Sequence, residues 1–362
     1  MGALRYRRAS NIPLKRQTVP VSVLRPMCGA DDNTEACLRT VFAQDYPAFE
    51  VLLSVQEESD AAVPVARKVM AEFPHIPSRL LVVGVSPLPN AKVWSLRTLV
   101  PAAANEIIMM TDSDIGLERD CLAITVAEMA REGVALITCP YRAVPGWSFW
   151  SRSEAMGLNT EFLAGMLTAR MLNGMDYAIG CTIVTRKADL ESIGGLLLLQ
   201  RYLAEDFVMG NLLHKAKREV VLSRSVIEHH IGGNEFLRNW KHRLRWARST
   251  RRSRGWAYVG ELFTKTTAIA LLLILMNPQA WGIAVVALCF RAAAAFFTGI
   301  WILNDPLLEK YWFLLPLEDI SSFVTWSLGF FGKTITWRGR ELVLAADGTL
   351  QAAQAQGPHP EG

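Results

Sequence analysis

The stretch Glu106-Ile-Ile-Met-Met-Thr-Asp-Ser-Asp114 decides the fold, because an aliphatic run passes directly into a pair of aspartates. A short aliphatic run of this kind is typical of a strand buried on both faces. In an open parallel sheet, ligands bind outside the carboxyl ends of the strands. Asp112 and Asp114 therefore stand where two carboxylates can hold Mg²⁺ or Mn²⁺ against a diphosphate, although a surface turn also accounts for an Asp-x-Asp triplet.

Four further aliphatic runs surround this one, at Val19–Leu24, Phe49–Val55, Leu80–Val83 and Val134–Thr138. Between the runs, apolar residues recur at helical spacing, in Asn33–Gln44, Ala61–Phe73, Trp94–Ala104 and Arg119–Ala130. Strands that alternate with helices predict an α/β fold with a parallel sheet and right-handed crossovers. Past Tyr141 we expect helices in Trp147–Leu172 and Ala204–Leu213, and strands in Ala178–Thr185 and Glu219–Ser223.

Composition places part of this chain in contact with lipid. Of the 362 residues, 51% are hydrophobic and 20% are charged, with a net charge of +4. That length allows about two domains, and the apolar fraction excludes intrinsic disorder. The six cysteines include no Cys-x-x-Cys pair, which argues against a zinc ribbon or a disulfide scaffold and fits a reducing compartment. The mean hydropathy of +0.19 is high for a soluble enzyme.

The apolar residues concentrate in one block, since Thr266–Phe290 contains no charged side chain. A helix that crosses hydrocarbon needs roughly 20 such residues, so we expect membrane insertion rather than a buried core helix. Basic residues on both sides of the block predict an even number of crossings. The two crossings are either a hairpin at Pro278, or Thr266–Phe290 outward and Tyr311–Gly332 back. Residues 1–16 are basic without an apolar core, so they predict no signal peptide and a cytoplasmic N-terminal region.

A basic stripe precedes the apolar block. Arg238–Arg254 holds eight Arg and Lys and no acid, interleaved with Trp240 and Trp246. Nucleic acid is one partner for such a stripe. The tryptophans and the neighbouring apolar block favour an amphipathic interfacial helix on an anionic phospholipid surface, and so no nucleic-acid partner.

Two further acidic positions have a structural and a functional interpretation. Asp60 follows the second strand and precedes a helix, where it either caps that helix or accepts hydrogen bonds from a nucleotide base. Glu205-Asp206 stands at a predicted helix start, where carboxylates are favourable in any case. The alternative for Asp206 is a general base whose pKa is set by its surroundings.

Taken in order, these residues resemble a known family. Asp60, Asp112-Ser113-Asp114, Glu205-Asp206 and His242-x-x-Arg245-Trp246, followed by an apolar block, are similar to a membrane-bound family 2 type glycosyltransferase. Longer stretches are closest to its ceramide glucosyltransferase branch, which includes bacterial ceramide and hopanoid lipid enzymes. Those stretches are Val21–Gly29, Gln44–Pro47, Val51–Gln56, Tyr202–Asp206 and Phe331–Arg340.

The resemblance implies a catalytic residue, donor ligands and a cofactor. Asp206 would take the acceptor proton, and Asp60 would bind the uracil of UDP. Asp112 and Asp114 would hold Mg²⁺ or Mn²⁺ and contact the donor. Arg245 and Trp246 would close over the diphosphate. Lys92 is a candidate phosphate ligand, because Asn90-Ala-Lys92-Val-Trp94-Ser95 partly matches the family segment Asn-Pro-Lys-x-x-x-Leu.

The resemblance also implies a fold and a reaction. The fold would be a Rossmann-like GT-A domain at 19–228, after a basic segment at 1–18. A basic interfacial region would follow at 229–256, membrane-embedded helices at 257–340 and a disordered tail at 341–362. The expected reaction is inverting transfer of a hexose, glucose by resemblance, from a UDP-sugar to a membrane lipid hydroxyl. The alternatives are a hopanoid or other lipid glycosyltransferase, such as an N-acetylglucosaminyl transferase, and a non-catalytic sugar-nucleotide-binding membrane protein. The expected location is the inner cell membrane, multi-pass, with the catalytic domain facing the cytoplasm.

Overall fold

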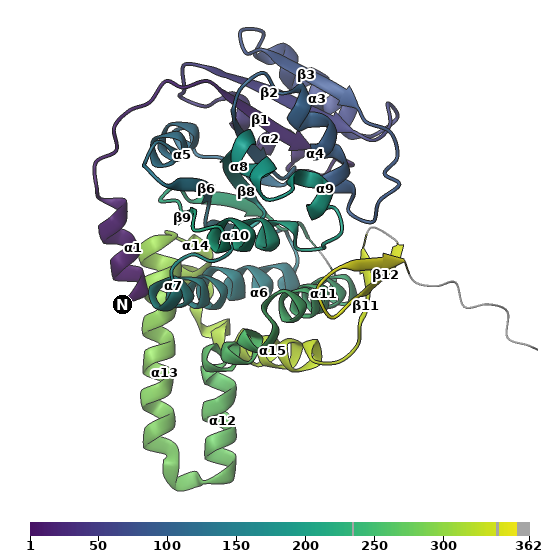
Figure 1. Cartoon of the computed structure of the whole chain (residues 1–362). Helices are drawn as coiled ribbons and strands as arrows, with labels where there is room; N and C mark the ends of the chain where they lie inside the picture. Colours follow the sequence, from purple (N-terminus) through teal and green to yellow (C-terminus); the bar gives the residue numbers. More distant parts are fainter. Residues whose placement is uncertain (234, 338–339, 353–362) are drawn as a thin grey trace, which may run out of the picture.

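The computed structural model describes residues 1–233, 235–337 and 340–352. A seven-stranded sheet in the order β3-β2-β1-β4-β8-β6-β9 forms its upper half in Figure 1. The strands are β1 (Val21–Pro26), β2 (Phe49–Val55), β3 (Ser78–Val82), β4 (Ile107–Thr111), β6 (Val134–Thr138), β8 (Thr182–Arg186) and β9 (Glu219–Leu222). A small second sheet, in the order β5-β10-β7, contains β5 (Ile115–Gly116), β7 (Tyr141–Val144) and β10 (Ile227–His230).

The expectation of a wholly parallel sheet is wrong at one strand. β8 lies between β4 and β6 and pairs antiparallel with both. The other neighbouring pairs in this sheet are parallel. A run of buried β-branched residues such as Thr182–Val184 has the same pattern in either direction, so strand direction is not readable from hydropathy. The five predicted strands of residues 19–141 all form, within about two residues of their predicted ends.

Helices cover the sheet, and their starts follow the predicted apolar periodicity. α4 packs on β1 and β2, α5 packs on β6 and β8, and α10 packs on β6 and β9. The helices of this part are α2 (Thr34–Phe42), α3 (Ala62–Glu72), α4 (Ala91–Ala102), α5 (Cys121–Met129), α8 (Lys187–Ser192), α9 (Gly195–Leu199) and α10 (Glu205–Lys215). Val23, Leu52 and Ile108, on three adjacent strands, are each fully buried in the core between these layers.

A second, helical layer lies below the sheet in Figure 1. It begins with α6 and η1 and takes in α11, α15 and the N-terminal helix α1, which packs on α7. Its elements are α1 (Gly2–Ser10), α6 (Phe149–Gly157), η1 (Leu158–Phe162), α7 (Leu163–Asn173), α11 (Phe236–Arg254), η2 (Gly255–Thr264), η4 (Phe296–Ile302), α14 (Pro306–Tyr311), η5 (Trp312–Leu314) and α15 (Leu315–Gly329).

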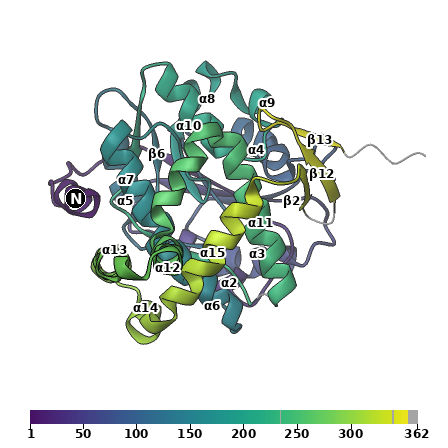
Figure 2. The ribbon, with the colours of Figure 1, turned by 90° about the horizontal axis from the view of Figure 1, so that it is seen from below.

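An antiparallel helical hairpin projects from this layer. α12 (Thr266–Met276) and α13 (Trp281–Ala295) pack along each other and are joined at Asn277 and η3 (Pro278–Ala280). The chain therefore turns at Pro278, as in the first of the two predicted topologies, while α15 lies across the base of the hairpin (Figures 1 and 2). Among the described residues, Pro278–Ile302 forms a helix of a length and apolarity that would allow a membrane crossing. A second stretch qualifies only if Phe236–Thr264 and Thr266–Met276, bent by 66°, count as one span.

The prediction of disorder from residue 341 is wrong for Glu341–Ala352. β11 (Thr334–Trp337), β12 (Arg340–Leu344) and β13 (Leu350–Ala352) form a three-stranded antiparallel sheet. Its strands bury Ile335, Leu342, Leu344 and Leu350 against Leu203, beside the start of α10. The strands have an alternating apolar pattern, but the Ala- and Gln-rich composition of the residues that follow favours disorder for the whole segment. Residues 353–362, and Arg338 and Gly339 of the resemblance, lie outside the described residues.

Candidate functional site

The Asp-x-Asp turn lies at the carboxyl end of β4, where the apolar run of that strand stops. Asp112 donates its backbone N–H to the Cys181 carbonyl at 3.1 Å. The fully buried Arg25 of β1 supports the turn from below, because its Nη2 donates to the carbonyls of Ser113 at 2.8 Å and Ile115 at 3.0 Å. These hydrogen bonds fix the backbone that carries the side chains of Asp112 and Asp114.

Lys92 joins three segments that are far apart in the chain. Its Nζ lies 2.8 Å from Asp112 Oδ1 and 3.3 Å from Glu205 Oε1, and donates to the Gly180 carbonyl at 2.9 Å. Burial by itself lowers the pKa of Lys92, but the carboxylates of Asp112 and Glu205 outweigh burial and raise it. Lys92 is therefore a permanent cation among the acids. Asn90, which caps α4, donates to the other Glu205 oxygen at 3.0 Å.

His229 of β10 faces the second aspartate. Its Nε2 lies 3.4 Å from Asp114 Oδ2. Burial raises the pKa of Asp114, but His229 outweighs burial and lowers it; Asp114 in turn raises the pKa of His229 against the effect of burial. The other oxygen of Asp114, Oδ1, and the Nδ1 of His229 are buried and have no hydrogen-bond partner in the structure.

Asp206 lies in the first turn of α10, beside the loop before β8. Burial, followed by the charge of Glu205, raises the pKa of Asp206 to about 7. A side-chain carbon on Gly180 would lie 2.7 Å from Asp206 Oδ2, so glycine is required for the carboxylate to sit there. Asp206 can stand at a helix start and still be a reactive carboxylate. Its position in the first turn of α10 also buries it, and burial keeps the carboxyl group partly protonated.

One cavity of about 440 Å³ connects these side chains. It is lined by six of the seven predicted site residues: Lys92, Asp112, Asp114, Asp206, Arg245 and Trp246. The lining continues over η1, α7 and the inner face of α11 as far as Thr264, two residues before α12 begins. A second cavity, of about 760 Å³ beside α1, contains none of the predicted residues.

Asp60 is the predicted residue that does not line this cavity. It follows β2, two strands away from β4 in the sheet. Its Oδ1 accepts from the backbone N–H of Ala62 at 2.8 Å, as a helix-start residue does, and from that of Gly29 at 2.9 Å. Asp60 therefore ties the loop after β1 to the loop after β2, at the carboxyl edge that also carries Asp112.

The basic stripe on α11 is largely engaged with protein. Arg243 pairs with Glu318, and Arg254 pairs with Glu261 at 3.0 Å. Arg251 donates to the Phe330 carbonyl at 2.6 Å, and Arg248 to the Phe331 carbonyl at 3.0 Å, so both bind the carboxyl end of α15. Cations are favourable at that end of a helix. His242 contacts Glu154 through Nδ1 at 2.9 Å.

Sequence reasoning missed three residues of this site. The sequence pattern assigns no role to Arg25 or His229, and it predicts Glu205 only as a carboxylate at a helix start beside Asp206. Arg25 did carry a signal, since a charged residue inside an aliphatic strand needs a buried partner. His229 and Glu205 carry none, because their partners Asp114 and Lys92 are 115 and 113 residues away along the chain and meet them only in the folded sheet.

These residues fit a divalent cation, although they do not by themselves form a complete set of metal ligands. Among the described residues, no three Asp, Glu, His or Cys side chains already form a metal site. Magnesium-type sites commonly use one or two carboxylates and take the other oxygens from substrate phosphates. The unpartnered Asp114 Oδ1, with Asp112 and the His229 imidazole beside it, supplies such a partial set.

The mixed sheet with an Asp-x-Asp turn at its carboxyl edge defines the GT-A class of glycosyltransferases. A mannosyltransferase from Pyrobaculum calidifontis, solved in complex with GDP-Man and Mn²⁺, has this fold. It covers 90% of this chain and 93% of its own, with a TM-score of 0.50 at 19% identity. At that identity the likeness shows the fold alone.

The chain belongs to glycosyl transferase family 21, whose model matches residues 3–350. Ceramide glucosyltransferase 1 of Caenorhabditis elegans is 29% identical over 199 residues, which are 54% of this chain and 42% of that relative. A ceramide glucosyltransferase of Komagataella phaffii is 31% identical over 132 residues, 35% of this chain and 26% of the relative. The matches thus span less than half the length of these relatives. The resemblance to the ceramide glucosyltransferase branch is confirmed.

Gly180→Ala tests whether the placement of Asp206 matters. The added methyl group would lie 2.7 Å from Asp206 Oδ2 and displace the carboxylate. A displacement of about 1 Å at a reacting group can reduce a rate by about 10²-fold, and we expect a loss of that order in sugar transfer. Gly165→Ala is the matched control, because its methyl group would meet Thr264 at an ordinary 3.7 Å in the same cavity. Equal rates for the two variants would contradict this assignment.

Proposed function

We propose that this chain transfers a hexose from a UDP-sugar to the hydroxyl group of a membrane lipid, with inversion at the anomeric carbon. The hexose we propose is glucose. One observation carries the proposal: a single cavity runs from Asp112, Asp114 and Asp206 to Thr264, at the base of the apolar hairpin. A polar donor and an apolar acceptor can reach the same point only through such a two-ended site. The chain's relatives are ceramide glucosyltransferases, which favours ceramide as the acceptor and glucose as the sugar.

The carboxyl edge of the sheet forms the donor end. Asp112 and Asp114, with His229, would hold Mg²⁺ or Mn²⁺, and that ion neutralises charge on the donor diphosphate when bound. The Pyrobaculum calidifontis neighbour was solved with Mn²⁺ and a nucleotide sugar, which supports a divalent cation of this kind. Asp60, whose Oδ1 accepts from the backbone N–H groups of Gly29 and Ala62 at this edge, would accept hydrogen bonds from the uracil.

Cationic side chains stabilise the leaving group. Lys92 stays charged beside Asp112, and Arg245 and Trp246 line the same cavity from α11. As the bond between the anomeric carbon and the diphosphate breaks, negative charge develops on UDP. Cations placed beforehand around that charge lower the barrier more than they stabilise the bound donor.

Asp206 supplies the base. The acceptor hydroxyl loses its proton to the Asp206 carboxylate as its oxygen attacks the anomeric carbon. The new carbon–oxygen bond forms on the face opposite the departing diphosphate, which inverts the configuration. A carboxyl group with a pKa of about 7 is a stronger base than an ordinary aspartate and is still half ionised near neutrality.

The acceptor end is apolar and faces the membrane side. Phe162 and Met166 of η1 and α7, with Tyr177 and Phe207, line the cavity beyond the carboxylates. A lipid whose hydroxyl group reaches Asp206 can thus keep the start of its chains in an apolar environment. The exposed Arg238 and Lys241 of α11 remain available for anionic phospholipid head groups.

Asp206→Asn separates the base from the helix-start role. Asparagine and aspartate are alike at helix starts, so only basicity is removed. We expect transfer, measured by mass spectrometry of the lipid product, to fall by at least about 10²-fold. UDP binding and thermal stability should stay near the wild-type values. Asp120→Asn, the same change at the exposed start of α5, is the control. If Asp206→Asn keeps most of the transfer activity, Asp206 is not the base.

The pH dependence of transfer should report Asp206. The ionised form is the active one, so protonation removes activity as the pH falls through the pKa of about 7. We expect kcat/KM to level off above that value and to fall about tenfold per pH unit well below it, because kcat/KM follows the free enzyme. A profile that stays flat down to pH 5 would show that no group with this pKa acts as the base.

Removal of divalent cations should abolish transfer. EDTA should remove activity, and Mn²⁺ or Mg²⁺ should restore it, because a divalent cation at Asp112 and Asp114 would neutralise charge on the donor diphosphate and on the leaving UDP. Weaker UDP binding after chelation, measured by calorimetry, should accompany the loss. Full activity after exhaustive chelation would refute the metal assignment to these two residues.

A further inference from the structure

α15 has its polar side chains inside and its apolar side chains outside. Glu318 and Asp319 are 1% and 0% exposed, whereas Leu317, Ile320, Val324 and Leu328 are between 39% and 51% exposed. These four recur at helical spacing and form one stripe along the helix. A helix in water has the opposite arrangement. The underside of the molecule, across which α15 runs in Figure 2, therefore faces an apolar environment.

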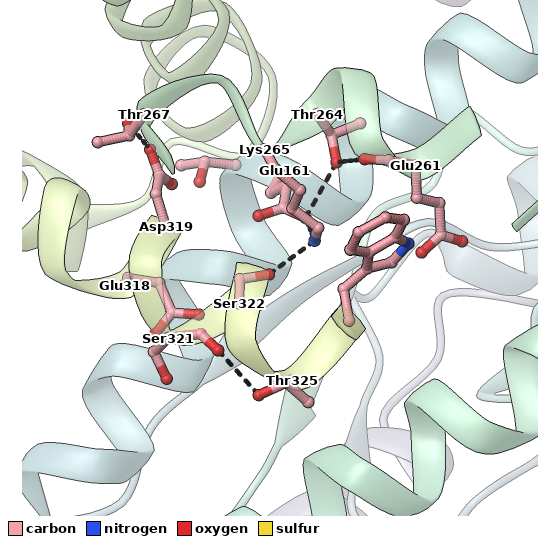
Figure 3. A network of polar contacts seen from close by, with 12 residues as sticks. Glu161, Glu261, Thr264, Lys265, Thr267, Glu318, Asp319, Ser321, Ser322 and Thr325 are labelled. Atoms are coloured by element: carbon pink, nitrogen blue, oxygen red, sulfur yellow. Dashed lines mark hydrogen bonds and ion pairs between the residues drawn. The ribbon is translucent and has the colours of Figure 1, made fainter. Parts of the chain in front are cut away.

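Buried ion pairs explain why the acids of α15 point inward. Arg291 of α13 binds Asp319 through Nη2 at 2.6 Å and through Nε at 3.0 Å, and Thr267 of α12 binds the same carboxylate. Lys265 pairs with Glu161 of η1 and donates to Ser322 at 2.8 Å. Figure 3 shows part of this network, in which Thr267 contacts Asp319 and Lys265 contacts Ser322. Both arms thus leave the protein at charged residues that are held inside it.

The arms beyond these residues are short. α12 has 11 residues, which at 1.5 Å per residue is roughly 16 Å. The part of α13 from Trp281 to Phe290, before Arg291, is similar. Its residues Trp281, Ile283 and Phe290 are 66% to 72% exposed. A bilayer has a hydrocarbon core of roughly 30 Å, so the arms reach about its middle.

Exposed aromatic side chains lie in the two elements that lead into α12 and α15. Trp256 and Phe263 of η2, the element that leads into α12, are 91% and 85% exposed. Trp312 of η5, which leads into α15, is 66% exposed. Tryptophan is enriched where hydrocarbon meets head groups. The exposed Lys310 and Lys333 lie on either side of α15 in the chain and suit an anionic lipid surface.

We propose that the chain enters only one leaflet of the membrane: α15 lies flat at the head-group boundary, and the α12–α13 hairpin ends near the bilayer midplane. Both ends of the hairpin then remain on the side of the catalytic cavity. This replaces both arrangements of two full crossings expected from hydropathy. The turn at Pro278 leaves two arms of about half a bilayer each, and Tyr311–Gly332 contains α15, which packs on α11 and α6. The inference takes membrane contact from the proposed function, and it is independent of the sugar and the acceptor.

Depth-dependent quenching in vesicles tests the proposal. The full chain, with the exposed Cys28 and Cys289 replaced by alanine, receives one cysteine at Gln279→Cys in the tip or Leu328→Cys on α15. Each is labelled with a polarity-sensitive fluorophore and bound to vesicles of phosphatidylcholine and phosphatidylglycerol that carry nitroxides at a shallow or a deep position. Leu197→Cys on α9, at a site 62% exposed in the sheet half, is the aqueous reference.

We expect the tip to be quenched at least about twofold more by deep than by shallow nitroxides, and position 328 to show the reverse. The reference should be quenched by neither. A membrane-impermeant thiol reagent enclosed in the vesicles should leave an unlabelled Gln279→Cys unmodified. Modification from inside would show a full crossing and overturn the proposal. Absence of quenching at both 279 and 328 would overturn it too, and would point to another cover for this surface, such as a second copy.

Transfer measured in the same vesicles separates the two proposals. The quenching profile should be unchanged in Asp206→Asn, because that residue lies outside the hairpin and α15. A full crossing with intact transfer would leave the proposed function standing. The predicted quenching profile without transfer under any donor and lipid pair would leave the single-leaflet attachment standing and remove the proposed function.

Discussion

The site depends on one electrostatic constraint: several carboxylates gather in a buried space, and Lys92 is the cation that makes this possible. Asp112 comes from the end of β4 and Glu205 from the start of α10, and both lie within 3.3 Å of the Lys92 ammonium. An unpaired charge removed from water is strongly destabilising, so these segments can approach only around a cation. In the same space, burial and then the charge of Glu205 raise the pKa of Asp206 to about 7.

Buried charges are also paired in the lower helical layer, next to the hairpin. Lys265 with Glu161, Arg243 with Glu318 and Arg291 with Asp319 each join a helix of the lower layer to another helix of that layer or to the hairpin. These pairs hold charged groups inside, and the outer surface of α15 and of the hairpin arms is then largely apolar. Buried pairs of this kind contribute more to a defined geometry than to net stability. Here the geometry they define is the position of the hairpin relative to the catalytic cavity.

The position of the hairpin links the cavity that contains the carboxylates to the apolar surface of the molecule. The cavity ends at Thr264, and Lys265 and α12 follow at once in the chain. In the proposed function, a lipid that stays in its leaflet would bring only its head group, with the acceptor hydroxyl, near these carboxylates. The proposed attachment to one leaflet would suit this task, since the acceptor would not leave the membrane and the water-soluble donor would not enter it.

Local pattern was sufficient for much of this protein. Strands such as Phe49–Val55 and Val134–Thr138 form as predicted, because buried strands have a short-range signature. Asp112, Asp114 and Asp206 were found because each directly follows or begins an element, and Lys92, Arg245 and Trp246 through an ordered resemblance. The sequence leaves the turn at Pro278 as one of two alternatives, and the packing of α12 on α13 decides between them. Local pattern does not give strand direction or distant partners: β8 runs antiparallel because it pairs with β4 and β6, and the strands at Arg340–Ala352 bury their apolar side chains against the distant Leu203. Arg25 beneath the Asp-x-Asp turn and His229 beside Asp114 belong to the same group. Their roles arise only when the sheet brings together residues about 90 to 115 positions apart, because Coulomb and hydrogen-bond interactions act over a few ångströms of space and not along the sequence.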